Sequence, residues 1–467
     1  MGANQNCEQY QQLAQIQEVL KKEGQHGLRD GIVSSIYEQA EEIAKKVVMK
    51  EGSKKISWDE KLDDLLTSKY TGFPIMFLLL GCIFWLTIAG ANVPSAMLAD
   101  FFFGLEDKLT HWFISMNAPH WLHGILILGM YRTLAWVVSV MLPPMAIFFP
   151  CFTLLEDLGY LPRVAFNLDK LFKKAGAHGK QSLTMSMGFG CNAAGVIACR
   201  IIESPRERLI AILTNNFVPC NGRFPTLIAL STMLVGGIVG AQYSTMAASF
   251  FVTLLVLVGI GATLLASWGL SKTLLKGVPS SFTLELPPYR RPQIGRILYQ
   301  SLIDRTIFVL GRAIAVAAPA GVVIWILANV MVGEQSILAH SAAFLDPFAR
   351  WIGLDGFILM AFILGLPANE IVLPIMIMSY MAEGAMLELD SLEAMIELFV
   401  ANGWTWLTAL NVMLFSLLHY PCGTTLWTMR KETGSIKWTF FGALMPTAMA
   451  VVCLFIITQG VRLMGWL

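Results

Sequence analysis

Long apolar blocks recur along this chain of 467 residues, and most of its charged residues lie in the shorter segments between them. A helix needs about 20 consecutive apolar residues to cross the hydrocarbon core of a bilayer. The composition agrees with this pattern, since 55% of the residues are hydrophobic and only 14% are charged. Soluble domains carry about 25% charged residues. The sequence therefore predicts an all-α, polytopic integral membrane protein with membrane lipid as its surroundings.

Several function classes have no support in the residues. The net charge is +1, so nothing indicates a nucleic-acid partner. A nucleotide-binding P-loop is absent, because Gly179-Lys180 is followed by Gln181 and lacks the earlier glycine. H-E-x-x-H and C-x-x-C metal motifs are absent as well. We therefore expect a chain that is not an enzyme and has no tightly bound cofactor.

The first part of the chain predicts a cytoplasmic start. Residues 1–70 are polar, and apolar positions recur at helical spacing over 36–48, which indicates an amphipathic helix. Basic residues then precede the first span, 72–91, and positive charge beside a span favours the cytoplasmic side. The loop 92–119 contains three acidic residues and is expected on the external side of the cell membrane. We therefore predict that 71–120 comprises the first span and this external loop.

The next apolar blocks contain helix breakers. A span over 121–155 holds Pro143, Pro144 and Pro150, which are expected to kink or break it. The block 182–202 has basic residues on both sides and two glycines with Asn192 at its centre, so it is better explained as a re-entrant hairpin.

The remaining blocks complete two similar halves. The expected elements are a span over 209–235 broken at 219–225, a span over 245–270, a cytoplasmic linker over 271–304, a span over 307–332, a block over 357–380 broken at 365–370, and spans over 404–429 and 438–461. The order of span, hairpin, broken span and span thus occurs twice, in opposite orientations. We predict two inverted gate repeats, 121–270 and 305–467. Val218-Pro219-Cys220-Asn221 in the first matches Tyr420-Pro421-Cys422-Gly423 in the second.

Paired broken helices of inverted repeats indicate a transport site near the midplane of the membrane. The breaks carry the candidate ligands, which are Cys191, Asn192, Cys220, Glu370, His419 and Cys422. Thiolate, imidazole and carboxylate groups suit a divalent transition metal better than they suit Mg²⁺ or Ca²⁺. A carboxylate such as Glu370 within an apolar block also indicates function, because burying it is expensive.

Structural explanations exist for the same residues. Membrane-buried cysteines are often apolar filler, Glu370 could pair with Arg312 for assembly, and His419 could donate a hydrogen bond where helices pack. Arg223 could neutralise a carboxylate. The functional alternatives are a permease for Mn(II) or for a nucleoside, the latter using Phe189, Phe217 and Asn216, or a membrane scaffold or regulator that transports nothing.

Several ordered motifs resemble the ferrous iron transporter B family, FeoB. They are Leu155-Glu156-Asp157-Leu158-Gly159-Tyr160 with Arg163, Ala165 and Phe166; Gly188-Phe189-Gly190-Cys191-Asn192 with Cys199-Arg200; Pro219-Cys220 with Arg223 and Pro225; Glu285-Leu286-Pro287-Pro288-Tyr289-Arg290; Glu370-Ile371-Val372; Pro421-Cys422-Gly423-Thr424-Thr425; and Arg430-Lys431-Glu432-Thr433-Gly434-Ser435.

The resemblance implies a gate region that passes Fe(II) into the cytoplasm. It also implies an N-terminal GTP-binding domain, which this chain lacks, so a separate GTPase partner acting through residues 1–50 is expected. The chain would then be the membrane half of a split system, a degenerate paralogue or a shortened chain; a homo-oligomer is a further expectation. Two departures lie at the gate: Pro367-Ala368-Asn369-Glu370 replaces Pro-Lys-Glu, and His419-Tyr420 precedes Pro421-Cys422.

Overall fold

A computed structural model describes residues 35–44, 46–47, 58–68, 70–239, 244–277, 289, 292–382, 384 and 392–465. Almost all of these residues are helical, and strands β1 (Met331–Val332) and β2 (Gln335–Ser336) form a short antiparallel pair. Within the described ranges four helices are long and apolar enough to cross a membrane, or up to six if each of two bent helix pairs is one span. The chain is an all-α, multi-pass membrane protein.

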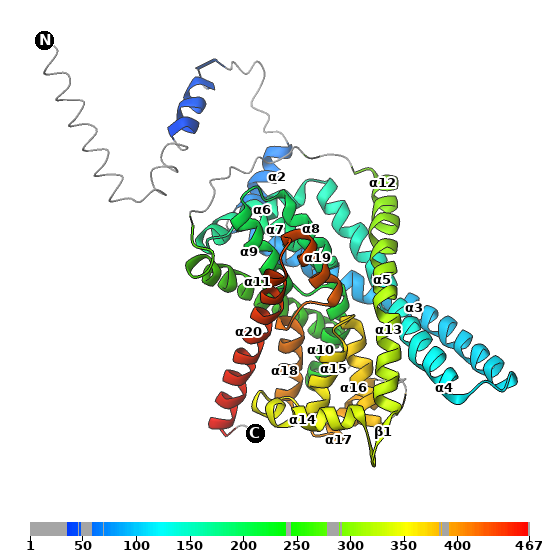
Figure 1. Ribbon diagram of the computed structural model, residues 1–467. Coiled ribbons are helices and arrows are strands. Elements are labelled where there is room, and N and C mark those ends of the chain that lie inside the picture. The colour runs from blue at the N-terminus through cyan, green and yellow to red at the C-terminus, as the bar shows by residue number, and fades with distance from the viewer. Residues whose placement is uncertain are drawn as a thin grey trace, which may run out of the picture.

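The N-terminal segment is helical where it is described. Residues 35–44 and 46–47 form exposed helix, in agreement with the predicted amphipathic helix, whose last residue, 48, lies outside the described residues. The next helix, α2 (Trp58–Thr67), precedes the first membrane helix. Figure 1 places α2 beside α6 at one end of the molecule, which we call the α6 end; the opposite end carries α14 and α17.

The predicted first span and its external loop are one helix. Helix α3 (Gly72–Ser115) continues through Pro94 and through the segment expected to be a loop. Glu106 explains part of this, because its buried carboxylate accepts hydrogen bonds from Arg132, 2.8 Å from Nε and 2.6 Å from Nη2. Tyr131 also donates to the carbonyl of Phe102 at 3.0 Å. These contacts hold the second half of α3 against the returning chain as a projecting helical arm (Figure 1).

The second span is continuous. The arm returns through α4 (His120–His123) and the π-helix η1 (Gly124–Tyr131) into α5 (Arg132–Asp157). All three prolines lie inside α5, and the helix does not end at any of them. Of the two expected outcomes, a kink or a break, the break is therefore excluded. Proline is tolerated in membrane helices because neighbouring groups satisfy the freed backbone atoms.

The next elements contain the first two predicted breaks. Cys191 is extended between α7 and α8, and a short irregular segment separates η3 from η4. The elements are α6 (Tyr160–Lys174), α7 (Gln181–Gly190), α8 (Asn192–Ala198), η2 (Cys199–Ile201), α9 (Pro205–Thr214), η3 (Asn215–Phe217), η4 (Asn221–Arg223), α10 (Phe224–Val239) and α11 (Ser244–Lys272).

The later elements repeat this order. A break precedes η6, and a second one separates α18 from α19. The elements are α12 (Ile294–Tyr299), η5 (Gln300–Ile307), α13 (Phe308–Asn329), α14 (Ile337–Trp351), α15 (Gly356–Leu364), η6 (Asn369–Ile371), α16 (Val372–Met381), α17 (Leu392–Ala401), α18 (Trp406–Leu418), α19 (Gly423–Thr433) and α20 (Ile436–Leu463). Figure 1 places α7, α8 and α9 toward the α6 end and α14, α15 and α16 toward the other end. The exact repeat boundaries stay a prediction.

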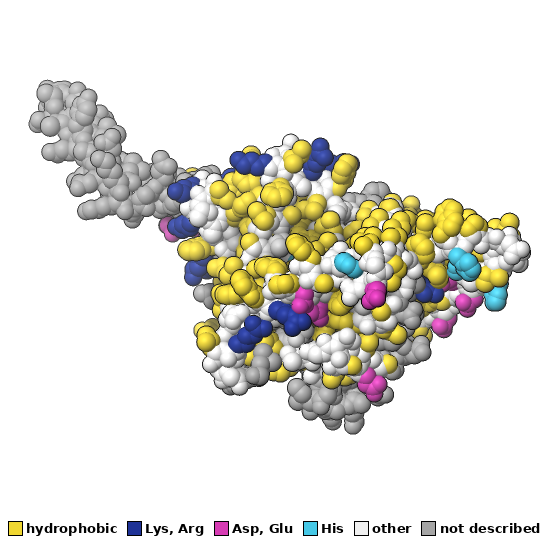
Figure 2. Space-filling view, turned by 60° about the horizontal axis from the view of Figure 1, so that its bottom comes forward, with side chains coloured by type: hydrophobic (Ala, Val, Ile, Leu, Met, Phe, Trp, Pro, Cys, Tyr) yellow, Lys and Arg dark blue, Asp and Glu magenta, His cyan; other side chains and the backbone are white. Residues whose placement is uncertain are grey.

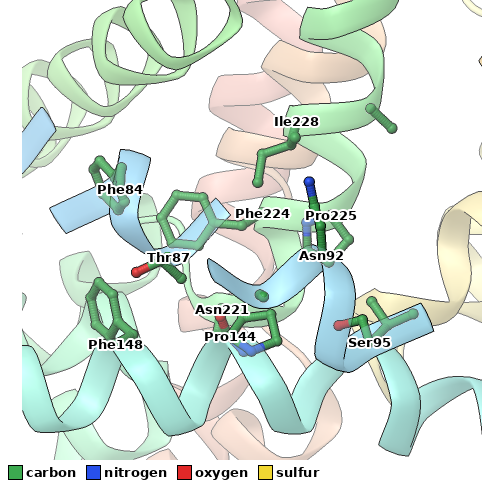
Figure 3. Close-up of a pocket in the computed structure, with 13 residues that line it drawn as sticks. Phe84, Thr87, Asn92, Ser95, Pro144, Phe148, Asn221, Phe224, Pro225 and Ile228 are labelled. Carbon is green, nitrogen blue, oxygen red and sulfur yellow. The ribbon is translucent and has the colours of Figure 1, made fainter. Parts of the chain in front are cut away.

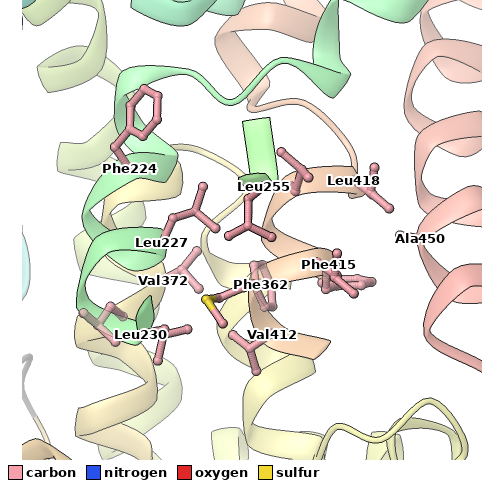
Figure 4. Packing of buried hydrophobic residues seen from close by; sticks show 14 of the residues in the cluster. Phe224, Leu227, Leu230, Leu255, Phe362, Val372, Val412, Phe415, Leu418 and Ala450 are labelled. Carbon is pink, nitrogen blue, oxygen red and sulfur yellow. The ribbon is translucent and has the colours of Figure 1, made fainter. Parts of the chain in front are cut away.

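A shared core joins the two halves. Leu227 and Leu230 of α10 pack among residues of α15, α16 and α18, including Phe362, Val372 and Phe415 (Figure 4). All five side chains are buried. Because such interiors are close-packed, neither half can shift without the other repacking.

The outer surface suits a lipid environment. Figure 2 shows hydrophobic side chains over much of the visible face, with charged side chains in only a few places. Large exposed apolar residues occur on the long helices, among them Val93, Phe250 and Phe440, which are 67%, 74% and 66% exposed. A soluble protein rarely exposes so much contiguous apolar surface.

Candidate functional site

Five of the six candidate ligands line one small cavity. The cavity has a volume of about 50 Å³, enough for an ion with a little water, since one water needs about 10–15 Å³. Its walls come from all four breaks, with one residue each from α5 and α13. The lining residues are Met141, Gly190, Cys191, Asn192, Cys220, Gly222, Ala313, Pro367, Ala368, Asn369, Glu370, Cys422 and Thr424.

The breaks bring these residues together by a common local design. Cys191, Cys220 and Cys422 each occupy the position just before a helical segment and have extended backbone angles. Ala368 holds the equivalent position before η6. A residue at this position leaves the helix axis, so its side chain and the following amides face the space between the broken ends.

Glu370 lies deep in this space against the neighbouring turn. Its side chain is buried, and a β-carbon on Gly222 would overlap its carboxylate. No salt bridge to Glu370 is found among the side chains that the structure describes. The side chain of Arg312, the suggested partner, lies outside the described residues. A buried carboxylate that faces a small cavity inside a membrane protein is a natural place for a cation.

Asn192 is fixed by its neighbours. In the amide orientation that satisfies both ends, its side-chain nitrogen donates to the carbonyls of Gly188 and Val218 at 3.2 and 3.1 Å. The carbonyl of Asn192 in turn accepts from the Asn215 amide at 3.1 Å. The first two breaks are therefore tied together beside the cavity.

The cavity is not a preformed metal centre. Among the described residues, no three His, Cys, Asp or Glu side chains are grouped closely enough to hold a metal ion. The three thiols and Glu370 instead lie around the same space on different broken segments. A permeation pathway needs binding that is weak enough to release the solute, so spread ligands are compatible with transport.

His419 lies outside the cavity lining. Its Nδ1 donates to the carbonyls of Phe415 and Ser416 at 2.9 and 3.0 Å, and its ring packs between Phe362 and Phe415. Its Nε2 has no hydrogen-bond partner in the described part of the chain. These contacts correspond to the alternative in which His419 supports helix packing.

Arg223 has a different environment from the one expected. Its guanidinium donates to backbone carbonyls and one side-chain amide oxygen, whereas a carboxylate partner was anticipated. No carboxylate forms a salt bridge with it within the described residues. The sequence signal was its place in a Pro-Cys-Asn-Gly-Arg break. Two of its five acceptor atoms belong to nearby Asn216, and the other three come from a segment almost 200 residues away.

A second, larger cavity lies on the other side of the η4 turn. Its volume is about 250 Å³, and helices α3, α5 and α10 form its walls. Figure 3 shows Phe84, Phe148 and Phe224 around it, with Asn221 at one side. Asn221 belongs to η4, whose neighbours Cys220 and Gly222 line the smaller cavity. The η4 turn is therefore the partition between the two spaces.

Two of the sequence motifs meet at the α6 end. Arg163 Nε donates to Asp63 Oδ1 at 2.9 Å, and its guanidinium stacks on the Tyr289 ring 4.0 Å away. Tyr289 also donates to Asp63 Oδ1 at 2.8 Å. Partial burial raises the pKa of Asp63, but the hydrogen bonds from Arg163 and Tyr289 outweigh it, so the pKa lies below the ordinary value. Burial and the bond to Asp63 raise the pKa of Tyr289 to about 12.

Comparison with known proteins gives a family for this arrangement. The family described as Gate, nucleoside recognition, matches residues 138–234 and 310–436. The one described as ferrous iron transport protein B C terminus matches residues 252–304. The first match contains all four breaks, and the second covers most of α11 and the segment up to η5. The chain belongs to the FeoB family.

Curated relatives support this membership across the described helices. A protein named Fe(2+) transporter FeoB from Staphylococcus aureus (strain MSSA476) is 30% identical over 412 residues, 86% of this chain and 59% of the relative. A protein of the same name from Methanocaldococcus jannaschii is 28% identical over 457 residues, 95% of this chain and 64% of that protein. The chain thus spans about three fifths of these FeoB relatives. No solved structure matches it significantly.

Proposed function

We propose that the chain is a permease for Fe(II), which crosses the membrane through the small cavity between the four breaks. The observation that supports this most strongly is the convergence of Cys191, Cys220, Cys422 and Glu370 on one space between the broken helices. Thiolate and carboxylate ligands together suit a borderline divalent metal. The curated relatives carry the name Fe(2+) transporter.

The size of the cavity favours a metal ion over a nucleoside. Sites for drug-sized organic ligands usually have volumes of about 300–1,000 Å³, whereas this cavity has about 50 Å³. Phe189, Phe217 and Asn216, the residues considered for a nucleoside, do not line it. Phe189 packs against Phe84 and Phe152. Mn(II) is harder to distinguish from Fe(II) than a nucleoside is. Both are divalent metal ions, and they differ mainly in the stronger preference of Mn(II) for oxygen ligands.

The proposal includes inward transport, and the charge distribution supports the membrane orientation that it assumes. Basic residues such as Lys170, Lys173 and Arg206 lie at the α6 end, together with α2. Positive charge next to the spans favours the cytoplasmic side, which supports a cytoplasmic position for α2 and the N-terminus. A separate GTPase acting through residues 1–50 is the proposed regulator; most of that segment lies outside the described residues.

The test is uptake into liposomes that contain the purified chain. Fe(II), Mn(II), Zn(II) and uridine are offered separately, and Fe(II) is expected to enter fastest. Cys191→Ser and Glu370→Gln should reduce Fe(II) uptake at least about tenfold, the effect of losing roughly 1.4 kcal/mol of stabilisation along the pathway. Cys453→Ser and Glu397→Gln are the matched controls, since neither residue lines the cavity.

Two results would contradict the proposal. The first is Fe(II) uptake at the wild-type rate in both cavity variants. The second is uridine uptake in the absence of metal uptake, which would favour the nucleoside alternative. Adding a soluble GTPase and GTP to the same liposomes tests the regulator; unchanged flux together with no binding to the chain would exclude it.

A further inference from the structure

Arg223 is a fully buried cation that joins the two halves of the molecule. Its side chain has 0% exposure. Nη1 donates to the carbonyls of Asn216 and Leu417, both at 2.9 Å. Nη2 donates to Asn216 Oδ1 at 3.0 Å and to the carbonyls of His419 and Tyr420 at 3.2 and 3.0 Å. Three of these five hydrogen bonds link the break after α9 to the break after α18, and the other two hold Arg223 to Asn216 within the first half.

The charge is stabilised by the ends of helical segments. Leu417 is in the last turn of α18, and His419 and Tyr420 follow directly, so their carbonyls lie at the negative end of that helix. Asn216 belongs to the 3-10 turn η3 at the end of the preceding broken helix. A guanidinium inside a membrane protein is tolerated only where such groups surround it. The contact therefore requires both breaks to keep their present positions.

A second bond reinforces the same junction. The side-chain nitrogen of Asn216 donates to the carbonyl of His419 at 2.6 Å. Arg223 and Asn216 both come from the first half, and both reach the segment that carries Cys422. We call this pair, with its five carbonyl and amide acceptors, the Arg223 clamp.

The clamp exists in only one half. Aligning Val218-Pro219-Cys220-Asn221 with Tyr420-Pro421-Cys422-Gly423 places Thr425 at the position equivalent to Arg223. Thr425 is buried, and its hydroxyl lies 3.3 Å from Cys422 Sγ. A threonine cannot reach across to the other half as an arginine does, so the two halves are not interchangeable at this point.

We propose that the Arg223 clamp holds the two broken segments together and so keeps the cavity closed until transport requires it to open. This inference rests on the proposed transport function. Cys220 and Gly222 precede Arg223 on the same turn, and Cys422 follows the last carbonyl acceptor, Tyr420, by two residues. Separation of the two breaks therefore moves three cavity-lining residues at once. Arg223 acts as a positioning residue through this backbone and does not touch the ion.

Substitutions that keep part of the clamp test it. Arg223→Lys retains the positive charge but loses the planar fork that serves several acceptors at once. Asn216→Leu retains Arg223 and removes the side-chain amide. The readout is the rate at which a charged, membrane-impermeant thiosulfonate modifies Cys191, Cys220 and Cys422, in a background where the other cysteines are replaced by alanine. Rates are measured on the folded, monodisperse fraction in liposomes.

We expect Arg223→Lys to raise the modification rate at least about tenfold, because a lysine cannot serve several of these acceptors at once and so loses charge-assisted hydrogen bonds. Asn216→Leu should raise it by a smaller factor. Arg206→Lys is the matched control: Arg206 also donates to backbone carbonyls, those of Leu275 and Gly176, but far from the breaks. Its modification rate should equal that of the wild type.

The outcomes separate the clamp from the proposed function. Modification rates that stay at the wild-type value in both Arg223→Lys and Asn216→Leu would overturn the clamp. Increased modification in a chain that transports no divalent metal would support the clamp and reject iron transport. Increased modification together with altered Fe(II) uptake would support both.

Discussion

Gly222 faces Glu370 so closely that a β-carbon added to Gly222 would overlap the Glu370 carboxylate. The two residues belong to different halves of the molecule, on η4 and η6. Glycine is required here because a β-carbon would occupy the space of the carboxylate oxygens. The position of Glu370 in the cavity therefore depends on residue 222 having no side chain.

Gly222→Ala should displace Glu370 and impair transport without unfolding the chain. We expect Fe(II) uptake to fall at least about tenfold, equivalent to about 1.4 kcal/mol. Gly261→Ala, on α11, is the control because a β-carbon there meets no atom within 4 Å. Equal uptake by the two variants would show that the placement of Glu370 does not matter.

Asp63→Asn should loosen the contact of α2 with α6. The change removes the carboxylate that accepts from Arg163 and Tyr289 and leaves the guanidinium of Arg163, which has a 2% exposed side chain, without its anion. We expect a loss of about 1–3 kcal/mol, measured as a lower Tm in detergent. The exposed neighbour Asp64 provides the control variant, Asp64→Asn. A Tm reduced equally by both changes would contradict this role.

The same contact should respond to acid. Because the folded-state pKa of Asp63 is depressed, its stabilisation is present above the unfolded value of about 3.9 and is lost as the pH falls through the folded pKa. The difference in Tm between the wild type and Asp63→Asn should therefore shrink below about pH 4. A Tm difference that stays the same at the lowest pH measured would argue against a charged Asp63.

His178 should give a second pH dependence, nearer neutrality. It lies in the turn between α6 and α7, where its Nδ1 accepts a hydrogen bond from the Lys180 amide at 3.0 Å. Burial lowers its pKa, although Glu207 partly opposes this. Its stabilisation is thus present above the unfolded value of about 6.5 and is lost as the pH falls through the folded pKa. His178→Asn should reduce the drop in Tm between pH 7.5 and 5.5, whereas His340→Asn, at an exposed site, should not.

Phe84→Ala should destabilise the packing behind the first two breaks. The Phe84 ring lies 4.9 Å from that of Phe224 and 6.0 Å from that of Phe189, which follow and precede the breaks. Truncation of a buried phenylalanine costs about 3–5 kcal/mol in well-packed cores. Phe101→Ala, on the exposed part of the same helix, is the comparison. A Tm that falls no further for Phe84→Ala would contradict a supporting role for α3.

The breaks could be predicted because they depend on local chemistry. Gly190, Asn192, Pro219, Pro367 and Pro421 lie in or beside extended backbone, and each disfavours helix for a reason visible in the residue itself. The long helix α3 could not be predicted in this way. Its second half is held by the pairing of Glu106 with Arg132, which are 26 residues apart, so its acidic residues were assigned to a loop.

The sequence predicted which residues line the cavity better than it predicted where their side chains point. Cys191, Asn192, Cys220, Glu370 and Cys422 were candidates because they lie at breaks, and they line one space. His419 is also at a break, but its ring turns into the helix packing. Which way a side chain points from a break depends on the segments packed around it, and a linear pattern does not contain that information.

The sequence by itself determined the membrane class, the apolar helices and the places where they break, because hydrophobicity, glycine, proline and charge act over a few neighbouring residues. Only the tertiary structure decided which breaks meet. It placed Gly222 against Glu370 and gave Arg223 acceptors almost 200 residues away, because close packing of the two halves brings these groups together.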